Sequence, residues 1–515
     1  MNQSLKFFVV FLFSAFAIFN WTSLFNIIAV GDVAGDMLTA NKIKDEGYLL
    51  LGHWSVWKFN HPGPFWFYYN YLIENIFSWL PLSRIQKWYL GSLILNSFLI
   101  AYSARILSFY YLNRFNIIYA FIFIFFLTQF SESILELWMP FRIIAPYLAF
   151  FVCLLPLSKG NFNYLFPCIL FSCLLIHGYA IMPFFTLPFI ILAFFMGYRF
   201  NQHLKKYKFV FILSAFTALL FSLPILIDYF INQPYSNLNR LFLANQKMQI
   251  AEKPALSEII FEVLYRFINK IPSHIKTPDY TLFYLIPFLI FYILLSSKEH
   301  RGQLSKKHFE INNFLNNAKP VLFFSIVTYL FTIFYFAFRT SKPFIFYAVH
   351  FLTIVPPILF LTLLTPFFLF AWENKQKTIY FKPLHYLFIL IISLVLFFSK
   401  QEPDEGIAYF ERKTKQFVSF LEKQNPPIYL GIDLQSGIDF AAQTVHLILG
   451  ILAYLNDQNI SICITDTSTE SAINLTQKHR CVENLKPQWL IVPAKKCHYY
   501  KQCVLTDGYF GLAKQ

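Results

Sequence analysis

The sequence predicts a polytopic α-helical membrane protein with about 11 transmembrane helices and a small C-terminal α/β domain. Apolar residues make up 57% of the 515 residues and charged residues only 13%, whereas soluble domains have about 45–50% and about 25%. Long apolar stretches recur up to Lys400, and beyond it the composition becomes that of a soluble domain. We therefore divide the chain into a membrane domain, 1–400, and a soluble domain, 401–515.

The first predicted span covers residues 5–30. Its start, Lys6 before a Phe/Val/Leu run, resembles a cleavable signal peptide, but the apolar run continues and many spans follow, so we expect it to be retained. Further apolar stretches lie at 64–80, 88–110, 116–130, 139–157, 161–177, 179–197, 209–230, 280–297, 318–338, 344–371 and 384–399.

Charge distribution predicts the topology. If every stretch crossed the membrane, the basic loop 199–208 would lie outside, against the positive-inside rule. If 64–80, which follows Pro62-Gly63-Pro64, lies along the interface instead, every basic loop becomes cytoplasmic. The first outer loop is then 31–87, the long outer loop is 231–279, and the C-terminal domain is extracytoplasmic. The net charge of +15 is spread over these short loops, which argues against a nucleic-acid partner.

The C-terminal domain reads as an α/β module, with strands at 427–432, 461–465 and 488–492 and a helix at 437–455. It holds four of the seven cysteines, Cys463, Cys481, Cys497 and Cys503. In an oxidising compartment they would form two disulfides, with three possible pairings, of which the local pair Cys497–Cys503 is favoured. A zinc site is the alternative, but the spacings match no familiar ligand pattern.

The first outer loop carries the candidate chemistry. Asp32 and Asp36 are four residues apart, which places them on one face of a helix where the chain leaves the membrane. Such carboxylates can accept a proton from an attacking hydroxyl or hold a divalent cation, Mg²⁺ or Mn²⁺. Capping of a helix by Asp32 is the structural alternative. At the far end of the loop, prolines fix the backbone around His61, a candidate phosphate contact.

This arrangement resembles the GT-C superfamily of integral-membrane glycosyltransferases, closest to a poorly characterised bacterial branch. The resemblance rests on Gly31-Asp32 after the first span, a Gly/Trp-containing stretch, and His61-Pro62-Gly63-Pro64 before aromatic residues. Shorter similarities continue at Trp138-Met139-Pro140, His177-Gly178-Tyr179, and from Leu223-Pro224 through Asp228 to Asn237-Leu238. The chain departs from the pattern in having Pro-Gly-Pro where many relatives have Pro-Pro, and it lacks a second Asp-x-Asp.

The resemblance implies a polyprenyl-phosphate sugar donor and transfer on the outer face. It identifies Asp32 as the catalytic base of an inverting hexosyl or pentosyl transfer, with Asp36 orienting the acceptor or binding metal. The acidic residues of the second outer loop fall on Glu132 or Glu136. For the lipid phosphate that leaves, the candidate partners in the outer loops are Arg339 first, then Arg142, Lys342 and His61.

The predicted function is therefore a glycosyltransferase of the bacterial inner membrane that uses a polyprenyl-phosphate sugar and a lipid, glycan or protein acceptor. Three alternatives stay open. They are a cell-surface polysaccharide ligase or polymerase, a transporter of lipid-linked sugars, and a non-catalytic scaffold with an outer sensing domain. A transporter would more often show two repeated halves, and we find no internal repeat.

Overall fold

The computed structural model of the chain divides into two compact units, residues 1–19 with 92–401 and residues 20–91 with 402–515. The residues it describes are 2–20, 24–25, 27–55, 59–130, 134–250, 254–260, 263, 309–339, 351–359, 361–362, 365, 405–432, 438–465, 481, 486–500, 502–507 and 509–514. The predicted spans at 280–297 and 384–399 lie outside these residues.

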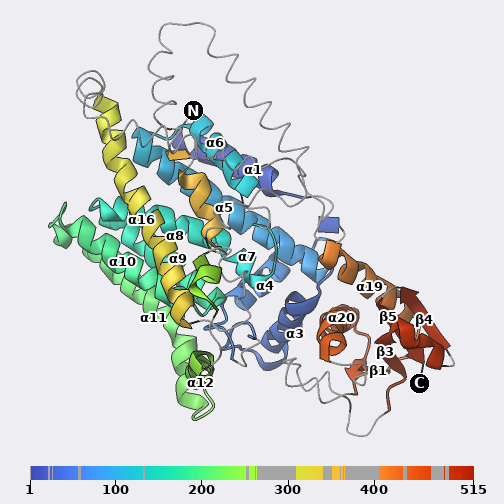
Figure 1. Ribbon diagram of the computed structural model, residues 1–515. Coiled ribbons are helices and arrows are strands. Elements are labelled where there is room, and N and C mark those ends of the chain that lie inside the picture. Colours follow the sequence, from blue (N-terminus) through green and yellow to red (C-terminus); the bar gives the residue numbers. More distant parts are fainter. Residues whose placement is uncertain are drawn as a thin grey trace, which may run out of the picture. The chain divides into compact units, whose positions relative to one another are not determined.

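The first unit is a bundle of apolar helices (Figure 1). Its helices are α1 (Gln3–Ile18), most of α5 (Arg84–Leu112), α6 (Ile117–Phe130), α7 (Met139–Arg142), α8 (Ile144–Ser158), α9 (Leu165–Gly178), α10 (Met182–Tyr198), α11 (Lys208–Ile231), α12 (Asn237–Ile250) and α16 (Phe309–Arg339), with short 3₁₀ turns η1 (Phe162–Tyr164) and η2 (Leu204–Tyr207). Every residue of α8 is buried, so α8 is the core helix around which α9 and α10 pack.

Four helical stretches among the described residues are long and apolar enough to cross a membrane: Arg84–Leu112, Met139–Ser158, Leu204–Ile231 and Asn316–Phe338. α11 buries only Ser214, Thr217 and Asp228, and its large apolar side chains, such as Phe209 and Phe216, are exposed. Apolar side chains turned away from the protein fit a lipid-facing helix. The chain is thus a multi-pass membrane protein.

Helix α1 ends at Ile18, inside the predicted span 5–30, where the chain turns extended at Phe19. The backbone of Asn20 then bonds to the Tyr89 hydroxyl, which both accepts from its N–H at 3.3 Å and donates to its carbonyl at 3.4 Å. The Asn20 carbonyl also accepts from the Leu24 N–H at 3.1 Å. Hydropathy alone does not reveal these long-range contacts to Tyr89.

The second unit joins the first outer loop to the C-terminal domain, although the sequence division placed that loop with residues 1–400. The loop forms α3 (Gly31–Glu46) and α4 (Phe65–Ile76). α4 spans only about 18 Å at about 1.5 Å per residue. Its exposed side chains Tyr68, Leu72 and Ile76 recur every four residues, which fits a helix along the interface better than a crossing one.

The C-terminal domain is a five-stranded sheet of order β2-β1-β3-β5-β4. The strands are β1 (Ile428–Ile432), β2 (Ile462–Ile464), β3 (Trp489–Pro493), β4 (Gln502–Asp507) and β5 (Phe510–Lys514), with the 3₁₀ turn η7 (Ala494–Tyr499) before β4. β1 pairs parallel with β2 and β3, whereas β5 pairs antiparallel with β3 and β4. Helices α19 (Glu405–Leu421) and α20 (Ile438–Asp457) complete it, and α20 packs extensively against α3.

Candidate active site

The Gly31-Asp32 motif forms the start of α3. Gly31 has φ +54°, and a Cβ added to it would lie 2.3 Å from Nδ1 of His446 in α20. Only glycine fits, because the backbone is left-handed and the side-chain space is filled. The residue before it, Val30, is the N-cap and makes no side-chain capping bond. Asp32 is therefore not the N-cap, and its carboxylate lies exposed in the first turn.

Asp36, one turn further along the same face, is buried and lies beside a histidine that sequence analysis did not select. Its Oδ2 is 2.6 Å from Nδ1 of His53, which is ion-pair range, although the two atoms are not aligned as a hydrogen bond. His53 is also buried, and its ring lies on Phe67 of α4 with centroids 4.7 Å apart. Its Nε2 has no hydrogen-bond partner among the described residues.

A short hairpin brings His53 and His61 together. His61 N–H donates to the His53 carbonyl at 2.7 Å, and Gly52 N–H donates to the His61 carbonyl at 3.0 Å. A Cβ on Gly52 would lie 2.6 Å from the Gly63 carbonyl oxygen, so this close pairing also requires glycine. The sequence signal that could have identified His53 is its position directly after Gly52, in the same loop as His61.

His61 is neutral at physiological pH. Desolvation in the folded loop, and secondarily the neighbouring His53, lower the pKa of His61 to about 3. A neutral imidazole can give a phosphate one hydrogen bond but no positive charge. His61 therefore suits a lipid phosphate as an orienting contact and not as its counter-ion.

A charge cluster centred on Glu74 holds α3, α4 and the start of α5 together. Arg84 Nε donates to Glu74 Oε1 at 2.5 Å, and its Nη1 donates to the Met37 carbonyl and the Asn41 side chain. Trp88 Nε1 and Lys44 Nζ reach the same Glu74 carboxylate at 2.7 and 3.1 Å. Burial opposes ionisation of Glu74, but these partners outweigh it and hold the pKa of Glu74 below its ordinary value.

The cluster lines a cleft of about 430 Å³, whose far wall is formed by Tyr454 and Asp457 of α20. Asp457 Oδ1 lies 3.7 Å from Arg84 Nη1. The C-terminal domain thus contacts the first outer loop at both ends of α3. The charge cluster fixes the helix that carries Asp32 and Asp36.

The other predicted site residues belong to the first unit or lie outside the described residues. Arg142 is fully buried at the end of α7, and Glu136 is half-buried just before it. Arg339 is the last residue of α16, and its side chain is not among those described. Glu132 and Lys342 lie outside the described residues.

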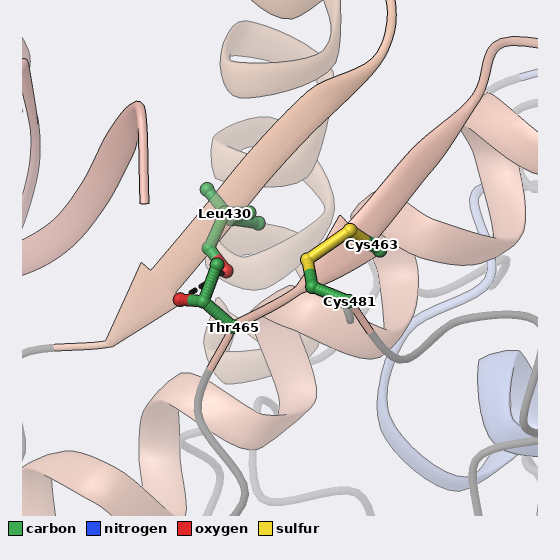
Figure 2. The surroundings of a disulfide bond; sticks show 4 residues. All are labelled: Leu430, Cys463, Thr465 and Cys481. Atoms are coloured by element: carbon green, nitrogen blue, oxygen red, sulfur yellow. Dashed lines mark hydrogen bonds between the residues drawn. A yellow bond between two sulfur atoms is a disulfide. The ribbon is translucent and has the colours of Figure 1, made fainter. Parts of the chain in front are cut away.

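The four C-terminal cysteines form two disulfides, Cys463–Cys481 and Cys497–Cys503. Figure 2 shows the first beside the Thr465 hydroxyl, which donates to the Leu430 carbonyl at the β1–β2 edge. Cys153, Cys168 and Cys173 are buried and unpaired in the bundle.

The described residues do not form a metal cage. No group of three or more His, Cys, Asp or Glu side chains with metal-ligating geometry occurs among them. Mg²⁺ demands near-octahedral oxygen coordination, whereas Asp36 is already occupied by His53. We therefore derive no chemical step through a metal ion.

Comparisons with known proteins identify solved structures that have a similar fold. No family model and no curated protein matches the sequence. The crystal structure of ArnT from Cupriavidus metallidurans bound to undecaprenyl phosphate superposes with a TM-score of 0.54 at 10% identity, covering 99% of this chain and 97% of that one. Its apo form gives 0.52 at 11% identity, over 99% and 98%.

The oligosaccharyltransferase AglB from Archaeoglobus fulgidus gives a TM-score of only 0.38 at 12% identity, covering 96% of this chain and 70% of that one. The likeness to ArnT extends over the whole chain, including the C-terminal sheet. At this identity it shows the fold alone. The chain therefore shares the fold of ArnT.

Proposed function

We propose that this chain is a membrane glycosyltransferase that transfers a sugar from a polyprenyl-phosphate donor to a cell-envelope acceptor, with Asp32 as the catalytic base. The observation that carries the proposal is the position of Asp32. It is an exposed carboxylate in the first turn of α3, behind a glycine that nothing larger can replace. The fold supports it, since the structure of ArnT, which has the same fold, contains undecaprenyl phosphate.

In the proposed reaction the acceptor hydroxyl oxygen forms a bond to the anomeric carbon. The bond from that carbon to the phosphate oxygen breaks, and its electron pair leaves with the polyprenyl phosphate. Asp32 takes the hydroxyl proton. Attack opposite the leaving group inverts the anomeric configuration.

The leaving phosphate needs cationic partners. Arg339, Arg142 and Lys342 are the candidates, with neutral His61 adding a hydrogen bond. Glu136 and Glu132 are the acidic candidates of the second outer loop. Asp36, held by buried His53, sets the orientation of the α3 face on which Asp32 lies.

We place the reaction on the outer face of the bacterial inner membrane, with the C-terminal domain extracytoplasmic. Under this topology the first outer loop and the disulfide-bonded domain lie on the same side. The disulfides support it, because structural disulfides persist in oxidising compartments.

The test is release of polyprenyl phosphate by the purified full chain in lipid, with a panel of undecaprenyl-phosphate sugars. Asp32→Asn should lower release by about 100-fold or more, the usual contribution of a general base. Asp45→Asn is the matched control, because Asp45 is an exposed aspartate on the same helix. Wild-type release by the Asp32→Asn protein would refute the assignment.

Two further arms separate the alternatives. Loss of release on addition of a chelator, restored by Mg²⁺ or Mn²⁺, would show that a divalent cation is needed. If folded wild-type protein releases nothing from any monophosphate donor, diphosphate-linked oligosaccharides are tested next, and release from them would identify a ligase or polymerase.

A further inference from the structure

His446, in the C-terminal domain, lies against Gly31 of the Gly31-Asp32 motif. Its ring fills the side-chain space that Gly31 lacks. The ring atoms nearest to a Cβ built on Gly31 are Nδ1, Cε1 and Cγ, at 2.3, 3.1 and 3.4 Å. His446 is nevertheless exposed. Since the Nδ1 side of the ring covers Gly31, Nε2 is the nitrogen left for a ligand.

Close packing fixes this position. α20 lies beside α3 (Figure 1), and small residues bring the two helices together. A Cβ on Gly450 would lie 2.9 Å from the Ala29 carbonyl oxygen, and one on Gly35 would lie 3.7 Å from Leu449. The approach is thus close at Gly450, whereas the distance at Gly35 is ordinary van der Waals contact. The packing of α20 on α3 places His446 at the start of α3.

His446 and Asp32 are close enough to bind one molecule. Successive Cα atoms are about 3.8 Å apart, so the imidazole over Gly31 lies within about 8 Å of the Asp32 Cα. Both side chains are exposed. A sugar ring carries hydroxyls on several neighbouring carbons, so one sugar can offer a hydroxyl to each of the two side chains.

We propose that His446 forms, with Asp32, a subsite for a carbohydrate acceptor. His446 Nε2–H donates a hydrogen bond to one hydroxyl, while the neighbouring hydroxyl gives its proton to Asp32 and attacks the donor. His446 itself takes no proton. The inference rests on the proposed role of Asp32 and deepens it by naming the acceptor class. α20 belongs to the sheet domain and not to the apolar bundle, which favours the water-soluble part of a substrate over a lipid chain.

The test measures how the donor sugar is partitioned. Each variant is expressed in cells that lack the native gene, and membranes are prepared from these cells. A radiolabelled undecaprenyl-phosphate sugar is added to the membranes. The label is then counted in endogenous glycan, as transferred sugar, and in free sugar, as hydrolysed donor. His446→Ala should lower the ratio of transferred to hydrolysed sugar by about 10-fold, as expected for one lost hydrogen bond. His446→Gln, whose amide reaches the Nε2 position, should restore most of it.

His498→Gln is the control, because His498 is another exposed histidine of the same domain. It should leave the ratio unchanged. An unchanged ratio in His446→Ala, or equal loss of both products, would overturn the subsite even if Asp32→Asn is inactive. Wild-type transfer by Asp32→Asn would instead overturn the role of Asp32, and this inference with it. Transfer of label to protein and not to glycan would overturn the acceptor class.

Discussion

At the scale of single residues, Gly31 decides whether Asp32 can occupy its place. A side chain at φ +54° costs about 1–2 kcal/mol, and a Cβ would also collide with His446. We expect Gly31→Ala to lower both the apparent melting temperature and donor turnover. Thermal unfolding of the purified protein in detergent measures the first effect.

The cost of the left-handed backbone and the cost of the collision with His446 can be measured separately. In the double variant Gly31→Ala/His446→Ala the collision is gone but the left-handed backbone is not, so only part of the lost stability should return. Gly47→Ala is the control, since Gly47 also has a positive φ, +81°, but nothing within 4 Å of its Cβ position. Equal melting temperatures for wild type and Gly31→Ala would contradict the packing of α20 on α3.

The residue scale also shows where sequence reasoning succeeds and where it stops. Asp32 and Asp36 were predictable because a spacing of four fixes a shared helical face. His53 was not, because its place beside Asp36 depends on the pairing of Gly52 and His61 across a hairpin. His446 lies more than 400 residues from Gly31 in the sequence, and local patterns carry no information about that contact.

At the scale of elements, Glu74 joins α4 to α3 and α5 through Lys44, Arg84 and Trp88. Removing one partner of a buried ion pair typically costs about 3–5 kcal/mol. We therefore expect Glu74→Gln to lower the apparent melting temperature at pH 7. Glu46→Gln removes the same charge from an exposed position and should have little effect.

The stabilisation by Glu74 should depend on pH. Because the pKa of Glu74 is lower in the folded chain than its ordinary value of 4.5, its contribution is complete above that value. It is lost as the pH falls through the folded pKa. The difference in melting temperature between wild type and Glu74→Gln should thus shrink in acid. A constant difference down to about pH 3 would show that packing, and not charge, is responsible.

Among the elements, those with a clear hydrophobic pattern were predicted closely. The strands β1, β2 and β3 and helix α20 lie within a residue or two of their predicted ranges. The hairpin β4–β5 was missed because β4 mixes polar residues with a disulfide cysteine and shows no regular alternation. α19 was missed although its apolar residues recur at helical spacing and form one face, a pattern that the sequence already contains.

At the scale of the whole molecule, the disulfides report on which side of the membrane the C-terminal domain lies. The predicted count of about 11 spans depends on the basic loops, and the described residues contain only part of the spans. The cysteines test the side of the C-terminal domain independently, because they become oxidised only outside the cytoplasm. The side on which the sheet folds also fixes the side of Asp32, since α20 packs on α3.

Thiol counting makes this measurable. Protein denatured in SDS and treated with a polyethylene-glycol maleimide should gain three adducts without reductant, on Cys153, Cys168 and Cys173, and all seven cysteines should react after reduction. Cys497→Ser frees Cys503 and should give a fourth adduct in unreduced protein, which calibrates the assay. Seven adducts without reductant, in protein extracted from the native membrane, would place the sheet in the cytoplasm. The first outer loop would then lie there with it, and transfer on the outer face would be wrong, because one packed unit cannot lie on both sides of a membrane.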